Sequence, residues 1–149
     1  MWGGDRPAVL YLPARLAAQI VAHAQEGFPE EVCGLVAGRS GYAVEVHPGR
    51  NISPTPRVAY ELDHETLARM IDFEDAGLEL VAIYHSHPAG PEGPSDTDIA
   101  RAAYPEAVYL IVSLSEPTRP VLRGFRIVAG QVCEVEICCP QPAPPSPDT

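Results

Sequence analysis

The run from Leu78 to Tyr84 (LELVAIY) restricts the possible folds of this chain more than any other segment. It is almost continuously apolar and rich in strand-forming residues, which is typical of a strand buried on both faces in the middle of a sheet. With 149 residues, the chain is large enough to cover both faces with a core of its own. The run ends directly at His85-Ser86-His87-Pro88, so the central strand is expected to deliver two histidines to one end of the sheet.

Three helices are predicted to cover this strand. The segment Pro13–Gly27 has apolar residues at helical spacing, with a proline at its start and a glycine at its end. A second helix is expected after Asp63, a candidate N-cap, and should end near Gly77. A third, short helix is predicted over Ser95–Tyr104.

Further strands and loops complete an α/β (α+β) sandwich, in which helices flank a mixed β-sheet. The proline-rich segment Asn51–Arg57 is expected to be a loop. Residues 1–139 would form the single domain, whereas residues 140–149 contain five prolines and are expected to be a disordered tail. The additional strands are predicted at Val32–Gly38, Tyr42–His47, Ala107–Leu114 and Val121–Val128, with a short extended segment at Val58–Leu62 and an edge strand at Val132–Ile137.

Composition excludes several classes of partner. The formal charge is −10, and the chain has no cluster of Lys and Arg, so nucleic acid is not an expected partner. No apolar run is long enough to cross a membrane, which favours a soluble protein. The four cysteines and the absence of a signal-like N-terminal segment indicate a reducing, cytoplasmic location. The oligomeric state is not predicted.

His85 and His87 are candidate metal ligands because they are two residues apart at the end of a predicted strand. Their side chains would leave the same face, about 6.6 Å apart along the backbone, so both imidazoles could reach one ion. A pair of this kind is weak evidence by itself, since paired histidines in a strand are more often packed or exposed to solvent.

Asp98 is a third candidate, and it has a structural alternative. Ser95 and Asp98 are three residues apart on the predicted helix and would share one face. Ser-x-x-Asp before an apolar stretch is also a capping box, with Ser95 as the N-cap. Considered without the histidines, the pair is better explained by capping.

Together, His85, Ser86, His87, Pro88, Ser95 and Asp98 form a series that resembles the JAMM motif of the Mov34/MPN/PAD-1 zinc metallopeptidases. The segment Asn51–Pro54, followed by Tyr60 and Asp63, resembles the short bacterial members. The resemblance implies Zn2+ held by His85, His87 and Asp98, and a fold related to the cytidine deaminases. Two imidazoles and one carboxylate are a typical catalytic zinc set, which leaves the fourth position for water.

The resemblance also implies a catalytic base. Glu31-Val32-Cys33-Gly34-Leu35-Val36-Ala37-Gly38 is similar to the family's Glu-x-x-Gly-Leu-hydrophobic-x-Gly segment, which assigns the base to Glu31 and leaves Glu30 at the surface. Without the metal motif, Glu31 would be interpreted as a solvated charge. Ser95 could donate its hydroxyl to the oxyanion, a role that would compete with capping. Cys33 is interpreted as a small core residue.

The implied activity is hydrolysis of a peptide or isopeptide bond at the C-terminal tail of a ubiquitin-like or sulfur-carrier protein, by metal-activated water with Glu31 as general base. Two alternatives differ in class. A deaminase would need His-x-Glu and Pro-Cys-x-x-Cys, and the sequence has neither. The other alternative is a non-catalytic MPN-type interaction module, and against it all of the implied metal ligands are present.

Overall fold

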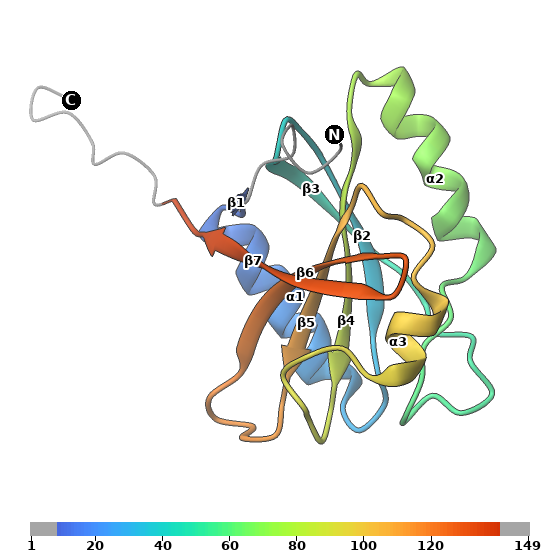
Figure 1. Ribbon diagram of the computed structural model, residues 1–149, viewed down its shortest axis with the longest axis vertical. Coiled ribbons are helices and arrows are strands. Elements are labelled where there is room, and N and C mark those ends of the chain that lie inside the picture. The colour runs from blue at the N-terminus through green and yellow to red at the C-terminus, as the bar shows by residue number, and fades with distance from the viewer. Residues whose placement is uncertain (1–8, 141–149) are drawn as a thin grey trace, which may run out of the picture.

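The computed structural model describes residues 9–140 and contains a strongly twisted sheet with three helices around it (Figure 1). The elements, in chain order, are β1 (Val9–Tyr11), α1 (Ala14–Gly27), β2 (Cys33–Arg39), β3 (Tyr42–Pro48), α2 (His64–Asp75), β4 (Glu79–His87), α3 (Asp96–Arg101), β5 (Val108–Ser113), β6 (Val121–Val128) and β7 (Gln131–Cys138).

The sheet is mixed, as expected, and it closes on itself. Its strand order is β1-β3-β2-β4-β5-β6-β7, and β1 pairs with both β3 and β7. The central strand β4 is antiparallel to β2 and parallel to β5. The sequence did not predict β1, whose three residues are too few to show alternation. Because β1 pairs with β7 over Glu136–Cys138, the prediction that β7 is a simple edge strand was wrong.

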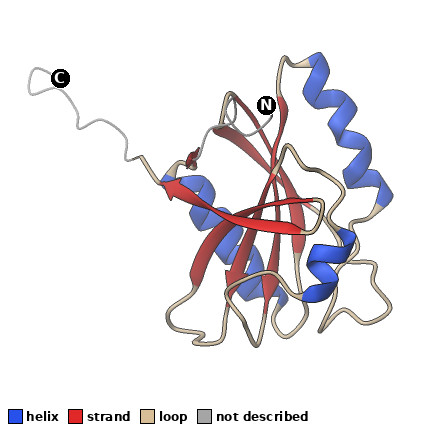
Figure 2. Ribbon diagram, in the orientation of Figure 1, coloured by secondary structure: helices blue, strands red, loops and turns tan. Residues whose placement is uncertain are grey.

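The helices cover opposite sides of the sheet and create two cores. In Figure 2, α1 lies behind the strands, whereas α2 and α3 lie at the right of the sheet. Leu16, Ile20 and Ala24 of α1 belong to one buried cluster. Phe73 of α2 belongs to the other, and Ile99 of α3 packs against it. This arrangement confirms the predicted α/β class, with a mixed sheet between helices.

The alternation of side chains along β4 places both histidines on one side. Ala82 and Tyr84 face the α1 core, and Ile83 faces the core beneath α2 and α3. Because successive side chains of a strand point to opposite faces, His85 and His87 lie on the side of Ile83. The predicted buried central strand is thus confirmed, and it includes the histidines themselves.

Two local predictions were wrong. Val58–Leu62 forms no strand, and only Leu62 makes a bridge, with Asn51, because the preceding prolines favour a turn. The third helix ends at Arg101, earlier than predicted, and Ala102 caps it in an extended conformation. The predicted tail lies outside the described residues, apart from Pro140.

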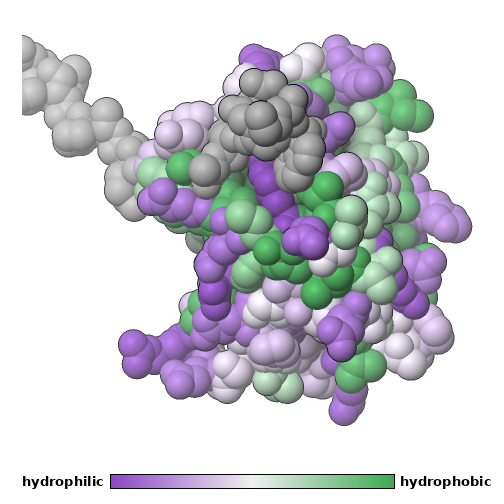
Figure 3. All heavy atoms as spheres, viewed as in Figure 1, coloured by the Kyte–Doolittle hydropathy of each residue, from purple (hydrophilic) through white to green (hydrophobic). Residues whose placement is uncertain are grey.

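Within residues 9–140, none of the helices combines the length and the apolar character needed to cross a membrane. On the face seen in Figure 3, hydrophobic residues over β7 lie next to hydrophilic ones, as expected for a strand with one side in water.

Candidate metal centre

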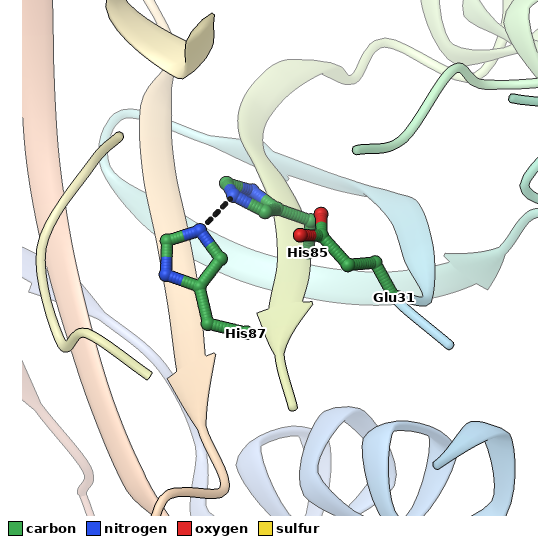
Figure 4. A group of neighbouring side chains, drawn as sticks. All are labelled: Glu31, His85 and His87. Atoms are coloured by element: carbon green, nitrogen blue, oxygen red, sulfur yellow. Dashed lines mark hydrogen bonds between the residues drawn. The ribbon is translucent and has the colours of Figure 1, made fainter. Parts of the chain in front are cut away.

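The two histidines of β4 point toward each other at the end of the strand (Figure 4). Their Nε2 atoms are 3.1 Å apart, and the side chains are only 1% and 4% exposed. The ring of Tyr60 stacks on that of His85 with a centroid distance of 4.3 Å, which shields this imidazole from water. The structure therefore brings both predicted ligands to one buried point.

Asp98 completes a triangle of polar atoms. Its Oδ2 atom lies 3.1 Å from Nε2 of His85 and 3.0 Å from Nε2 of His87. Three ligand atoms around a tetrahedral zinc ion are separated by roughly 3.3 Å, given Zn–N and Zn–O distances near 2.0–2.1 Å. The spacing of the three atoms thus fits a zinc ligand set without rearrangement of the backbone.

The proton balance of this triangle also calls for a cation. Nδ1 of His87 donates to the carbonyl oxygen of Pro91 at 2.8 Å, so a neutral His87 has a lone pair on Nε2. That lone pair lies 3.0 Å from an oxygen of the Asp98 carboxylate. Two acceptors this close and this buried require a proton or a metal ion between them. The donor set therefore fits a bound cation.

The helix cap and the position of Asp98 beside the histidines are compatible. The backbone N–H of Ser95 donates to Asp98 Oδ2 at 2.9 Å, and the N–H of Asp98 donates to Ser95 Oγ at 3.0 Å, which completes a capping box. The predicted cap is confirmed. Because Ser95 Oγ only accepts in the cap, its own proton stays available, and the expected competition for this hydroxyl does not arise.

Glu31 lies immediately beside the histidines (Figure 4). Ligand-type atoms of Glu31, His85 and His87 lie within 4.8 Å of one another. The Glu31 side chain is buried, and its Oε1 atom has no hydrogen-bond partner among the described residues. The neighbouring Glu30 is exposed, as predicted. Asp98 Oδ2 is hydrogen-bonded to both rings, whereas Glu31 Oε1 lies beside them unpaired among the described residues.

Burial and neighbouring charges shift the pKa values of these carboxylates in opposite directions. Burial raises the pKa of Glu31 to about 7; the Asp98 charge adds to this effect and His87 opposes it. Burial alone would raise the pKa of Asp98 as well, but hydrogen bonds from His85 and His87 hold it well below its usual range. Two nearby carboxyl groups with separated pKa values are typical of different roles in acid–base chemistry.

The pKa values of the histidines differ for a similar reason. Burial lowers the pKa of His85 despite its bond to Asp98. Burial acts in the same direction on His87, but the hydrogen bonds to Asp98 and Pro91 outweigh it and the net pKa is raised. The Asp98 carboxylate therefore favours the charged form of the His87 ring, whereas burial favours the neutral form of the His85 ring.

The backbone of Glu31 is fixed by residues to which the sequence analysis gave no role. Asn51 Nδ2 donates to the Glu31 carbonyl at 2.9 Å, and the N–H of Glu31 donates to Pro56 O at 2.7 Å. The N–H of Val32 donates to Ser86 Oγ at 2.8 Å. Asn51 could have been suspected, since an asparagine between turn residues commonly bonds nearby backbone groups.

Two of the other histidines have separate partners, and the cysteine near the site is internal. His23 Nδ1 lies 2.7 Å from the Tyr84 hydroxyl, and His47 Nε2 lies 3.1 Å from a carboxylate oxygen of Glu45. His64 is the first residue of α2. Cys33 is fully buried, as predicted.

Comparisons with known proteins agree with this arrangement. Residues 13–128 match the family described as prokaryotic homologs of the JAB domain. A desampylase of Haloferax volcanii is 45% identical over 111 residues, which cover 70% of this chain and 80% of that protein. A CysO-cysteine peptidase of Mycobacterium tuberculosis is 43% identical over 129 residues, or 85% of this chain and 88% of that protein.

The fold is also similar to that of solved structures. A protein from Desulfitobacterium hafniense superimposes with a TM-score of 0.79 at 34% identity, and the match covers 89% of this chain and 94% of that one. The family match at residues 13–128 includes β2, β4 and α3 and the loops beside them, and so contains Glu31, both histidines and Asp98. The chain therefore belongs to the prokaryotic homologs of the JAB domain.

Proposed function

We propose that this protein is a zinc metallopeptidase that hydrolyses a peptide or isopeptide bond at the C-terminal tail of a ubiquitin-like or sulfur-carrier protein. The observation that carries the proposal is the convergence of two imidazole nitrogens and one carboxylate oxygen, with an unpaired buried carboxyl group beside them. The names of two relatives, a desampylase and a CysO-cysteine peptidase, support the peptidase activity and the type of substrate.

The metal ligands in this proposal are His85 Nε2, His87 Nε2 and Asp98 Oδ2. Three protein ligands suit a catalytic rather than a structural site, because structural zinc usually has four. A bound zinc ion supplies Lewis acidity, which lowers the pKa of water and polarises a carbonyl group. The Ser95 N–H bond to Asp98 Oδ2 orients this carboxylate, and the Pro91 carbonyl orients the ring of His87.

Glu31 is the proposed general base and acid. Its Oε1 atom has no partner within the described residues, so it is available to take a proton from water and return it to the leaving nitrogen. In the metal-free protein burial raises its pKa to about 7, which favours a carboxyl group that can both accept and release a proton. The Ser95 hydroxyl group, whose oxygen accepts in the cap, is the proposed donor to the oxyanion that develops on the carbonyl.

Substitution of neighbouring glutamates tests this assignment, because Glu30 and Glu31 are adjacent but only Glu31 is buried at the site. We expect Glu31→Gln to retain about one zinc per chain and to lose hydrolysis of a ubiquitin-like protein fused through its C-terminal tail to a peptide. Glu30→Gln should match the unchanged protein in both measurements. Chelation should abolish hydrolysis, and added zinc should restore it.

Two results would contradict the proposal. An active Glu31→Gln protein would remove Glu31 from the mechanism. Protein that binds no zinc and hydrolyses no such fusion would instead favour the interaction module, the second candidate. No specific observation favours that candidate at present, since a module has no need for the convergence of Asp98 with His85 and His87.

A further inference from the structure

The loop at 88–95, between β4 and α3, is attached at both sides to residues of the candidate metal centre. At its start, the N–H of Gly90 donates to the carbonyl of His87 at 3.1 Å. Next along the loop, the carbonyl of Pro91 accepts from Nδ1 of His87 at 2.8 Å. At its end, Ser95 caps α3 and bonds to Asp98. A displacement of this loop would therefore move the hydrogen-bond partner of His87.

The loop is also held from outside, by Arg123 of β6. Glu92, the residue after Pro91, accepts from Arg123 Nη1 at 3.2 Å. The other guanidinium nitrogens of Arg123 bond to Glu134 of β7, at 2.6 Å from Nη2 and 2.9 Å from Nε. The guanidinium group also lies 5.4 Å from the centre of the Phe125 ring. Arg123 is thus fixed on the sheet by a bidentate pair, with its third nitrogen directed to the loop.

We propose that Arg123 is a positioning residue for His87. Through Glu92 it holds the Pro91 carbonyl where that oxygen accepts the Nδ1 proton. A neutral imidazole carries one proton, and the partner of one nitrogen decides which nitrogen carries it. With the proton on Nδ1, the lone pair of Nε2 faces His85 and Asp98. The inference rests on the proposed function in one respect, because it takes Nε2 of His87 as a metal ligand.

This role differs from that of a stabilising surface ion pair. Exposed pairs contribute little to global stability, and the side chains of Arg123 and Glu92 are 37% and 46% exposed. Loss of the pair should thus leave the melting temperature almost unchanged. Outer-shell partners of metal-binding histidines commonly alter metal affinity by about 10- to 100-fold. Because Arg123 acts through Glu92 and the loop, we expect the lower end of this range, about tenfold.

The experiment compares four single variants of the full chain and one double variant, Arg123→Ala/Glu92→Gln. Arg123→Ala and Glu92→Gln each remove the contact between the loop and β6, whereas Arg123→Lys keeps the charge and should recover part of the effect. Arg119→Ala, at an exposed arginine in the loop before β6, is the matched control. Zinc affinity is measured by competition with a chelator. The tautomer of His87 is read from ring 15N shifts of the metal-free protein, at a pH above the point where those shifts show that the ring has become neutral.

The expected result is a shift of His87 away from the Nδ1–H tautomer, together with about tenfold weaker zinc binding, in Arg123→Ala and Glu92→Gln but not in Arg119→Ala. The double variant should be no worse than either single one, because both remove the same contact. Unchanged tautomer and affinity, or additive effects in the double variant, would overturn the proposal. If the unchanged protein binds no zinc, the proposed function fails, while the tautomer measurement still decides the role of Arg123.

Discussion

The carboxylate of Asp98 takes part in a helix cap and, in the proposed function, also holds a metal ion, and substitution can separate these two roles. Oδ2 accepts from the N–H of Ser95 and lies within 3.1 Å of both imidazoles. In Asp98→Asn, the amide oxygen can still accept from Ser95, but the negative charge is lost. In Asp98→Ala, the charge and the hydrogen bond are both lost. Of the two hydrogen bonds of the capping box, Ser95→Ala removes the one that Ser95 Oγ accepts from the Asp98 N–H.

The magnitudes expected for these variants differ between stability and metal binding. Loss of a cap costs about 1 kcal/mol, which lowers the melting temperature by roughly 3 °C in a chain of this size. We expect that loss in the metal-free form of Ser95→Ala. Both Asp98 variants should lose more, because they also remove the contacts of the Asp98 carboxylate with His85 and His87. Removing a ligand should weaken zinc binding by more than the roughly 100-fold upper range of outer-shell changes. We expect this in both Asp98 variants, whereas Ser95→Ala should stay within a few-fold of the unchanged protein.

The assay pairs thermal unfolding of the metal-free protein with a chelator competition for zinc. Because Ser95→Ala should lose stability but keep its zinc affinity, it is the control for loss of the cap alone in the two Asp98 variants. If Asp98→Asn bound zinc as tightly as the unchanged protein, Asp98 would be a capping residue only. The carboxylate of Glu31, already within 4.8 Å of both histidines, would then have to be the third ligand.

Two further predictions concern residues around the site. Burial raises the pKa of the Cys33 thiol to about 12, and Asp63 and Glu31 add to the effect. Cys33 should therefore resist alkylation at pH 8, whereas the exposed Cys133 should react. Rapid labelling of Cys33 in the folded protein, detected by mass spectrometry, would contradict this prediction. Asn51→Ala removes hydrogen bonds to the backbone of Glu31, Ala59, Ser53 and Glu61, and should lower the free energy of unfolding by about 2–3 kcal/mol. Denaturant unfolding that gave a loss below about 0.5 kcal/mol would show that these bonds do not hold the segment.

The sequence predicted those parts of the site that depend on local periodicity. His85 and His87 share a face because they are two apart on a strand, and Ser95 bonds to Asp98 because they are three apart at a helix start. Local pattern could not reveal the closure of the sheet by β1, since three residues carry too little signal. It also could not show that capping and contact with the histidines share one oxygen, which depends on how α3 packs over β4.

The place of Glu31 depends on the register between β2 and β4, which no local pattern specifies. Cys33 pairs with His85, and Ser86 exchanges hydrogen bonds with Val32, so the antiparallel order carries Glu31 toward His87. Cys33 also faces the core beneath α2 and α3, and two residues earlier the chain presents Glu31 to that same side.

A slip of one residue in this pairing would turn Glu31 to the opposite face and bring its neighbour to the histidines. Gly34 opposes such a slip, because it pairs with Tyr84 and a Cβ atom there would lie 2.3 Å from the tyrosine ring. After a slip of one residue, the Tyr84 ring would lie over a neighbour of Gly34, and both neighbours carry a side chain. The glycine three residues after Glu31 therefore helps to fix which carboxyl group lies beside the two histidines, although it lies on the strand and not in the candidate site.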